Sequence, residues 1–68
     1  MGYQEKLGKN LLKARKKSGF TQLVLAEKVG IHVNYYAKIE RGEVKSSLDT
    51  LEAIFKALKV KSSDIIPF

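Results

Sequence analysis

The 68-residue sequence contains no cysteine and no tryptophan, one proline and a single histidine. Without cysteine, neither a disulfide framework nor a thiolate zinc site can supplement a small core. A lone histidine and the lack of a glycine-rich phosphate loop leave no set of side chains suited to catalysis or to a bound cofactor. The sequence therefore predicts a protein that is not an enzyme, with no metal and no cofactor.

Long hydrophobic runs are missing as well. No stretch approaches the ~20 apolar residues that a membrane-spanning helix needs, and the opening residues, MGYQEKLGKN, lack the apolar centre of a signal peptide. The predicted location is the cytoplasm of a prokaryotic cell, with no membrane partner. No repeat, low-complexity segment or long linker divides the chain, so residues 1–68 are expected to form one small domain.

Positive charge is plentiful but unevenly placed. The net charge is +6, and residues 1–45 hold ten Lys or Arg against four Asp or Glu, whereas residues 46–68 hold three of each sign. A basic part beside a neutral part indicates one surface for a polyanion and another for packing or self-association. Charge alone leaves open the alternative of a solvated basic face that aids solubility.

Hydrophobic periodicity predicts an all-α fold with five helices and no strands. The first helix covers roughly residues 4–17, where Leu7, Leu11 and Ala14 share one stripe with lysines opposite. Gly19 is suited to end this helix, because glycine readily adopts the left-handed conformation found at helix C-termini.

The C-terminal part predicts two further helices. Ser47 is a good N-cap for a helix that reaches about Leu58, and Ser62 or Ser63 is expected to cap a final turn that Pro67 ends. The longer of the two helices has an apolar stripe formed by Leu48, Leu51, Ile54, Phe55 and Leu58.

Residues 21–42 carry the most informative pattern. Two short helices, over about 22–29 and 33–40, are joined by a turn at Gly30, and Gly42 is expected to cap the second. Apolar or small residues stand where two steeply crossing helices need them: Leu25, Ala26, Val29, Ile31, Tyr36 and Ile39. This helix-turn-helix pattern makes DNA binding the leading hypothesis.

The outer face of the second of these helices suits a DNA groove. Asn34, Ala37, Lys38 and Arg41 share one face, and Val33 borders it. Asparagine can pair with adenine, lysine can donate to guanine, valine can touch a thymine methyl group, and alanine lets a helix lie close to the bases. The predicted base contacts are therefore Val33, Asn34, Ala37 and Lys38.

The chain resembles the Xre family, the Cro and lambda-repressor-like helix-turn-helix proteins. The resemblance is carried by LGKNLLKAR (7–15), GFTQ (19–22), LAEKVGI (25–31), IERG (39–42) and SLDTLEAIFKAL (47–58). The order and spacing of these motifs match the family over nearly the whole chain. The resemblance implies a sequence-specific transcriptional regulator, of repressor or controller type, that binds double-stranded DNA as a homodimer on a pseudo-palindromic operator.

The resemblance also implies roles for single residues. Contacts with the DNA backbone are expected around the two helices of the motif, from Thr21, Gln22, Tyr35, Arg41, Lys45 and Ser46. Arg15 and Glu40 match an internal ion pair that ties the first helix to the third. Tyr35 has two interpretations, because its hydroxyl can meet DNA or its ring can simply shield the helix end.

Several apolar residues depart from the family pattern. Leu23 and Val24 replace residues that are commonly polar, which favours an alternative function: an antitoxin or protein-interaction module with a protein partner. Together with Leu12, Phe55 and Phe68, these two residues indicate either a slightly larger core with scattered apolar residues on the surface, or a self-association surface. The predicted dimer surface consists of Phe55, Leu58, Val60, Ile65, Ile66 and Phe68.

Overall fold

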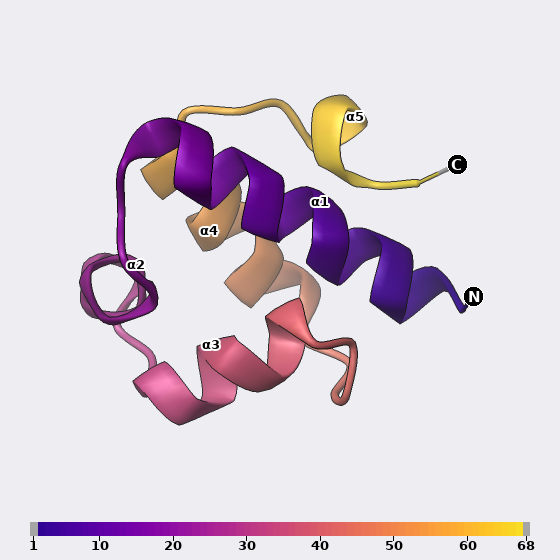
Figure 1. Ribbon diagram of the computed structural model, residues 1–68, viewed down its shortest axis with the longest axis horizontal. Helices are drawn as coiled ribbons and strands as arrows, with labels where there is room; N and C mark the ends of the chain where they lie inside the picture. The colour runs from indigo at the N-terminus through magenta and orange to yellow at the C-terminus, as the bar shows by residue number, and fades with distance from the viewer. Residues whose placement is uncertain (1, 68) are drawn as a thin grey trace.

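The computed structural model describes residues 2–67, which form five helices and no β-strand. The helices are α1 (Tyr3–Ser18), α2 (Gln22–Val29), α3 (Val33–Glu40), α4 (Leu48–Leu58) and α5 (Ser62–Ile65). In Figure 1, α1 crosses the upper part of the molecule, α3 lies along the lower edge and α2 is viewed end-on. The predicted all-α fold with five helices is confirmed. Among the described residues, no helix is long and apolar enough to cross a membrane.

Side chains from all five helices form one hydrophobic core. Its buried members are Leu7, Leu11, Leu25, Ala26, Tyr36, Ile39, Leu51, Ile54, Phe55, Leu58 and Ile65. Each large side chain buried in this way contributes roughly 1.5–3 kcal/mol through the hydrophobic effect. Because the chain has no cysteine, this core is the main source of its stability.

Local signals set several of the helix ends. The Thr21 hydroxyl accepts a hydrogen bond from the backbone amide of Val24 at 3.1 Å, which caps α2. The Ser47 hydroxyl caps α4 by accepting a hydrogen bond from the backbone amide of Thr50 at 3.2 Å. Gly19 follows α1 in the left-handed conformation. The Ser47 cap and the left-handed Gly19 agree with the sequence-based expectation.

Three details differ from that expectation. Helix α5 begins after Lys61 rather than after a serine cap, and the Lys61 backbone amide donates to the Asp64 carboxylate at 3.2 Å. Leu48 is 65% exposed, because it is the first residue of α4 and lies beyond the part of this helix that packs on the core. Arg41 is the C-cap of α3, and Gly42 adopts the left-handed conformation one residue later.

Gly30 makes the turn between α2 and α3. Its backbone angles, φ 86° and ψ 29°, lie in the left-handed region that residues with a Cβ atom rarely adopt. In this conformation the Gly30 and Ile31 amides both donate to the carbonyl of Ala26, at 2.9 and 3.0 Å. A Cβ atom on Gly30 would meet nothing within 4 Å, so the requirement for glycine is conformational rather than steric.

Gly8 lets α1 lie directly on the backbone of α3. A Cβ atom at this position would overlap the carbonyl oxygen of Glu40 and lie 2.8 Å from that of Ile39. These neighbours are backbone atoms, which cannot rotate aside as a flexible side chain can. Hydrophobic periodicity misses this contact because glycine adds no apolar signal. Gly8 therefore sets the separation between α1 and the end of α3.

Gly8→Ala is expected to lower the free energy of unfolding by about 1–3 kcal/mol. Alanine favours a helix over glycine by roughly 0.5–1 kcal/mol, but the overlap with the α3 backbone outweighs that gain. Urea denaturation followed by circular dichroism measures the change. Lys13→Ala, on the exposed side of α1, is the control and should alter stability by less than about 0.5 kcal/mol. A Gly8→Ala protein as stable as the parent would contradict the close contact.

Candidate nucleic-acid interface

Helix α3 has one exposed polar face and one buried face. Asn34 and Lys38 are exposed at the centre of the outer face, and Val33 and Ala37 are half-buried along one edge. The opposite face is buried and consists of Tyr36, Ile39 and Glu40. The structure therefore brings the four predicted base-contacting residues together on the accessible side of the helix.

His32 caps the start of α3. Its Nδ1 atom accepts a hydrogen bond from the backbone amide of Asn34 at 3.0 Å. The sequence alone does not indicate this cap, since histidine is not among the common N-cap residues. The cap thereby satisfies one of the backbone amides that have no partner within the helix at the N-terminus of α3.

A buried ion pair ties α1 to the end of α3. Arg15 donates to the Glu40 carboxylate twice, from Nε to Oε2 at 2.6 Å and from Nη2 to Oε1 at 3.3 Å. Its Nη1 atom also donates to the carbonyl of Phe20 at 2.8 Å. The side chains are only 11% and 4% exposed. Arg15 and Glu40 thus form the ion pair that the family resemblance implied, and Arg15 holds helices together.

Gln22 reaches the same carboxylate from α2. Its Nε2 atom donates to Oε1 of Glu40 at 3.0 Å, and the residue is half-buried. Gln22 is the first residue of α2 and Glu40 is the last residue of α3. The expected contact of Gln22 with the DNA backbone is untested, but the structure adds a role that sequence reasoning missed, a link between the two helices of the motif.

This environment shifts the pKa values of the buried groups. Burial alone would raise the pKa of Glu40, but the hydrogen bonds from Arg15 and Gln22 outweigh it and hold the pKa below the ordinary value of 4.5. The hydrogen bond to Glu40 raises the pKa of Arg15. Burial, reinforced by the neighbouring carboxylate, raises the pKa of Tyr36 far above its usual range. Glu40 is therefore ionised and Tyr36 neutral at physiological pH.

Arg41 follows α3 and pairs with Glu43. Its Nε atom donates to Oε2 of Glu43 at 2.7 Å, and Nη2 donates to Oε1 at 3.2 Å. Both side chains are more than half exposed, and the hydrogen bond from Arg41 lowers the pKa of Glu43. Sequence reasoning missed Glu43, although its position two residues after Arg41 is a signal for this pair. The carboxylate competes with any other anion for the Arg41 guanidinium.

The remaining residues expected at the DNA backbone differ in accessibility. Thr21 and Lys45 are exposed, and Tyr35 is half-buried against the core rather than freely solvated. The hydroxyl of Ser46 is buried, and no residue within 2–67 forms a hydrogen bond with it. The contact of Ser46 with the DNA backbone stays a prediction, and the buried hydroxyl leaves the half-buried residue's other atoms to make it.

The expected dimer surface is mostly part of the core. Three of its side chains are almost fully buried: Phe55, Leu58 and Ile65. For these three the expectation of an accessible surface is wrong, because a small chain needs its large apolar side chains for its own core. Val60 and Ile66 are half-buried, and Phe68 lies outside the described residues.

The two apolar residues that depart from the family pattern lie on the surface of α2. Leu23 is 54% exposed and Val24 is 39% exposed. Neither side chain belongs to the core, so the interpretation of a slightly larger core does not account for them. They are accessible to a partner, as the alternative function would require.

The architecture defines a five-helix domain in which α2 and α3 form a helix-turn-helix around Gly30. A family model described as Helix-turn-helix matches residues 11–65. The chain belongs to this helix-turn-helix family, which confirms the resemblance to the Cro and lambda-repressor-like proteins of the Xre family.

Two relatives of known role are similar in sequence. The chain is 40% identical over 60 residues to the immunity repressor protein of Bacillus phage phi105, across 88% of this chain and 42% of the repressor. It is 42% identical over 52 residues to the control protein C.BamHI of Bacillus amyloliquefaciens, across 76% of this chain and 64% of the control protein. The matched segment thus spans less than two thirds of either relative.

Solved structures of two regulators share the fold. The clp gene regulator ClgR from C. glutamicum superposes with a TM-score of 0.93 and 29% identity, over 96% of this chain and 83% of that chain. The restriction-modification controller protein C.AhdI from Aeromonas hydrophila gives a TM-score of 0.89 and 27% identity, over 93% and 96%. Both likenesses extend over nearly the whole of this chain.

The free energy of unfolding is expected to decrease as the pH falls through the lowered pKa of Glu40. An unfolded glutamate takes up its proton first, near its ordinary value of 4.5, so acid favours the unfolded chain. In Glu40→Gln this part of the pH dependence should disappear. The variant should also lose about 3–5 kcal/mol at neutral pH, because Arg15 is left buried without its partner.

Urea denaturation at a series of pH values measures both effects. Glu52→Gln, at an exposed position on α4, removes the same charge and is the control. Equal pH dependence in Glu40→Gln and in the parent protein would contradict the assignment to Glu40.

Proposed function

We propose that this protein is a small transcriptional regulator, of repressor or controller type, that binds double-stranded DNA through α3. The observation that carries the proposal is the outer face of α3, where exposed Asn34 and Lys38 lie opposite a buried apolar face. A helix built in this way, preceded by a tight turn and a second helix, is suited to lie in the major groove. The roles for which the relatives are named, a repressor and controllers, support the same function.

The chemistry of the face is complementary to base edges. The amide of Asn34 can form two hydrogen bonds with adenine, and the ammonium group of Lys38 can donate to guanine. Each such contact supplies roughly 1–3 kcal/mol of discrimination between bases. Val33 and Ala37 at the edge of the face bring small apolar surface next to thymine methyl groups. Sequence preference in this proposal arises from these four residues.

Contacts with phosphates place the helix in the groove without reading sequence. Exposed Arg41 and Lys45 follow α3, and Thr21 lies at the start of α2, where free backbone amides favour anions. Gln22 contributes by keeping the start of α2 fixed against Glu40. Because Gln22 contacts Glu40, the start of α2 and the residues that follow α3 lie at the same end of α3.

The proposal includes a homodimer on a pseudo-palindromic operator. One short helix contacts only a few base pairs, whereas two copies related by a two-fold axis place their α3 helices about one turn of DNA apart, ~34 Å. Half-buried Val60 and Ile66 remain as apolar contacts for a second copy. The cytoplasm of a prokaryotic cell, where DNA is directly accessible, is the location that belongs with this function.

The alternative of an antitoxin or protein-interaction module rests on Leu23 and Val24. Their exposure on α2 is compatible with a protein partner. It is the weaker proposal, because the relatives are named as regulators and because two exposed apolar side chains are common on soluble domains. Both functions can coexist, since the outer faces of α2 and α3 are separate surfaces.

Selection of bound sequences from a random duplex library, at physiological salt, tests the proposed function. A two-fold motif with half-sites about ten base pairs apart is the expected result. A single half-site would contradict the dimer while leaving sequence recognition in place. Enrichment of no sequence, with binding that disappears as salt rises, would overturn sequence-specific regulation.

Substitutions should separate base reading from backbone contact. Asn34→Ala and Lys38→Ala are expected to relax base preference while largely preserving binding to non-operator DNA. Lys45→Ala should weaken binding to every sequence and reduce the slope of log K against log salt by about one. Fluorescence anisotropy on operator and scrambled duplexes measures these changes. The same response from all three variants would refute this division of roles.

Glu43→Gln is expected to strengthen DNA binding about twofold to fivefold, since an exposed ion pair is weak and is easily exchanged for a contact with phosphate. The change releases the Arg41 guanidinium from its carboxylate partner and removes a negative charge near the phosphates. Glu52→Gln, an identical charge change on α4, is the matched control. If Glu43→Gln and Glu52→Gln bind DNA with equal affinity in anisotropy titrations, the gain results from the change in net charge, and the release of Arg41 is excluded as its cause.

A further inference from the structure

The side of α1 that faces away from the core carries a row of lysines. We name the α1 lysine row by its five exposed members: Lys6, Lys9, Lys13, Lys16 and Lys17. With 3.6 residues per turn, these positions fall within about a third of the helix circumference, opposite buried Leu11. The row runs for about 16 Å along the helix, at 1.5 Å per residue.

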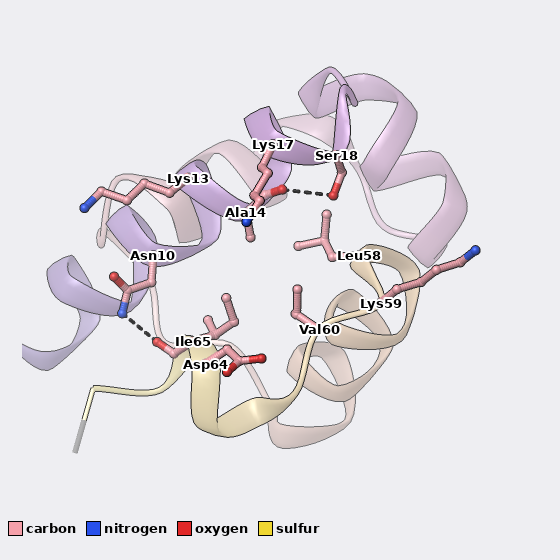
Figure 2. Close-up of a pocket in the computed structure, with 10 residues that line it drawn as sticks. All are labelled: Asn10, Lys13, Ala14, Lys17, Ser18, Leu58, Lys59, Val60, Asp64 and Ile65. Carbon is pink, nitrogen blue, oxygen red and sulfur yellow. Dashed lines mark hydrogen bonds between the residues drawn. The ribbon is translucent and has the colours of Figure 1, made fainter.

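The α1 lysine row is separate from the exposed face of α3. Helix α1 meets α3 through Gly8 and Arg15, and it meets α5 through Asn10, whose amide donates to the carbonyl of Ile65 at 2.7 Å. Lys13 and Lys17 are among the residues that line the groove between α1 and α5, whereas Lys6, Lys9 and Lys16 are exposed outside it. Figure 2 shows that the Lys13 side chain extends away from the groove between α1 and α5.

The fold makes little use of these charges. No carboxylate among residues 2–67 lies within ion-pair distance of Lys6, Lys13, Lys16 or Lys17. Positive charges three and four residues apart repel one another on a helix surface and destabilise it slightly. Within residues 2–67 the charges of Lys6, Lys13, Lys16 and Lys17 therefore remain available to an external anion.

We propose that the α1 lysine row is a second DNA-binding surface, which contacts the sugar–phosphate backbone of duplex DNA without regard to sequence. Duplex DNA carries a negative charge for about every 1.7 Å of its axis, so a row of this length can face several phosphates. Contacts between lysines and phosphates carry no sequence information. The surface therefore adds affinity and not specificity.

The composition of the row favours DNA over a protein partner. The centres of protein interfaces are depleted of lysine and depend on buried aromatic or apolar anchors. The row itself consists only of lysines. Of the leucines between them in the sequence, Leu7 and Leu11 are buried in the core and Leu12 is half-buried. The phosphates belong either to the flank of the duplex that α3 binds or to a second duplex held beside it. Both sources present the same chemistry, and the length of the duplex distinguishes them.

Two triple variants with the same net charge test the proposal. The first changes Lys6→Gln, Lys13→Gln and Lys16→Gln in the row, and the control changes Lys56→Gln, Lys59→Gln and Lys61→Gln in the neutral C-terminal part. Anisotropy titrations use random-sequence duplexes of two lengths, each at two salt concentrations that differ fourfold. Circular dichroism and a urea midpoint establish that both variants are folded, and the single change Lys13→Gln provides a milder test.

The ratio of Kd at the higher salt concentration to Kd at the lower one is expected to be about 40-fold smaller for the row variant than for the parent. Each phosphate contact contributes about 3.5-fold to this ratio over a fourfold salt range. For Lys13→Gln alone, this ratio of Kd values should be about 3.5-fold smaller than for the parent. An effect confined to long duplexes identifies the flank of the same duplex as the source. An immobilised duplex that captures a free duplex through the parent protein, but not through the row variant, identifies a second duplex.

Equal behaviour of the row variant and the control on every duplex would overturn the proposal. The α1 lysine row would then contribute only to the net positive charge of the protein, or it would be a surface that binds an acidic protein. This test uses DNA without an operator, so its failure is distinguishable from failure of base reading by α3. A row variant that still selects the operator motif but binds random DNA weakly would support both roles at once.

Discussion

The arrangement of the three N-terminal helices depends on the buried carboxylate of Glu40. Arg15 reaches it from α1 and Gln22 from α2, while Glu40 itself ends α3. An unpaired charge in a protein interior is costly, so the native structure must keep all three groups together. The two helices of the motif are consequently joined twice, by the turn at Gly30 and by this carboxylate. The outer face of α3 is presented on a support that has little freedom to tilt.

A backbone contact also fixes the short distance between α1 and the end of α3. At Gly8 the side of α1 rests on the carbonyl groups that end α3, and no side chain separates the two helices. A chain this small has few large apolar residues, and its core takes up Phe55, Leu58 and Ile65. Stability and self-association thus draw on the same limited set of side chains. In this protein the core holds most of them, and only partly exposed residues remain for a second copy.

Much of this structure follows from local rules. The caps at Thr21 and Ser47 and the turn at Gly30 locate the helix ends, and helical periodicity is enough to place Asn34 and Lys38 on the outside. These features depend on residues a few positions apart. The family motifs added the Arg15–Glu40 pair, which periodicity alone does not reveal.

The remaining features could not be predicted because they depend on contacts between distant segments. The half-buried position of Gln22 and the buried hydroxyl of Ser46 follow from where other helices lie, and nothing in their own neighbourhood announces them. The two faces of α3 have a further consequence for evolution. Since Asn34 and Lys38 take no part in the core, substitutions there leave the scaffold intact, and under the proposed function they would redirect the protein to another DNA target. A gene of this kind can diverge in specificity by a few substitutions, without passing through unstable intermediates.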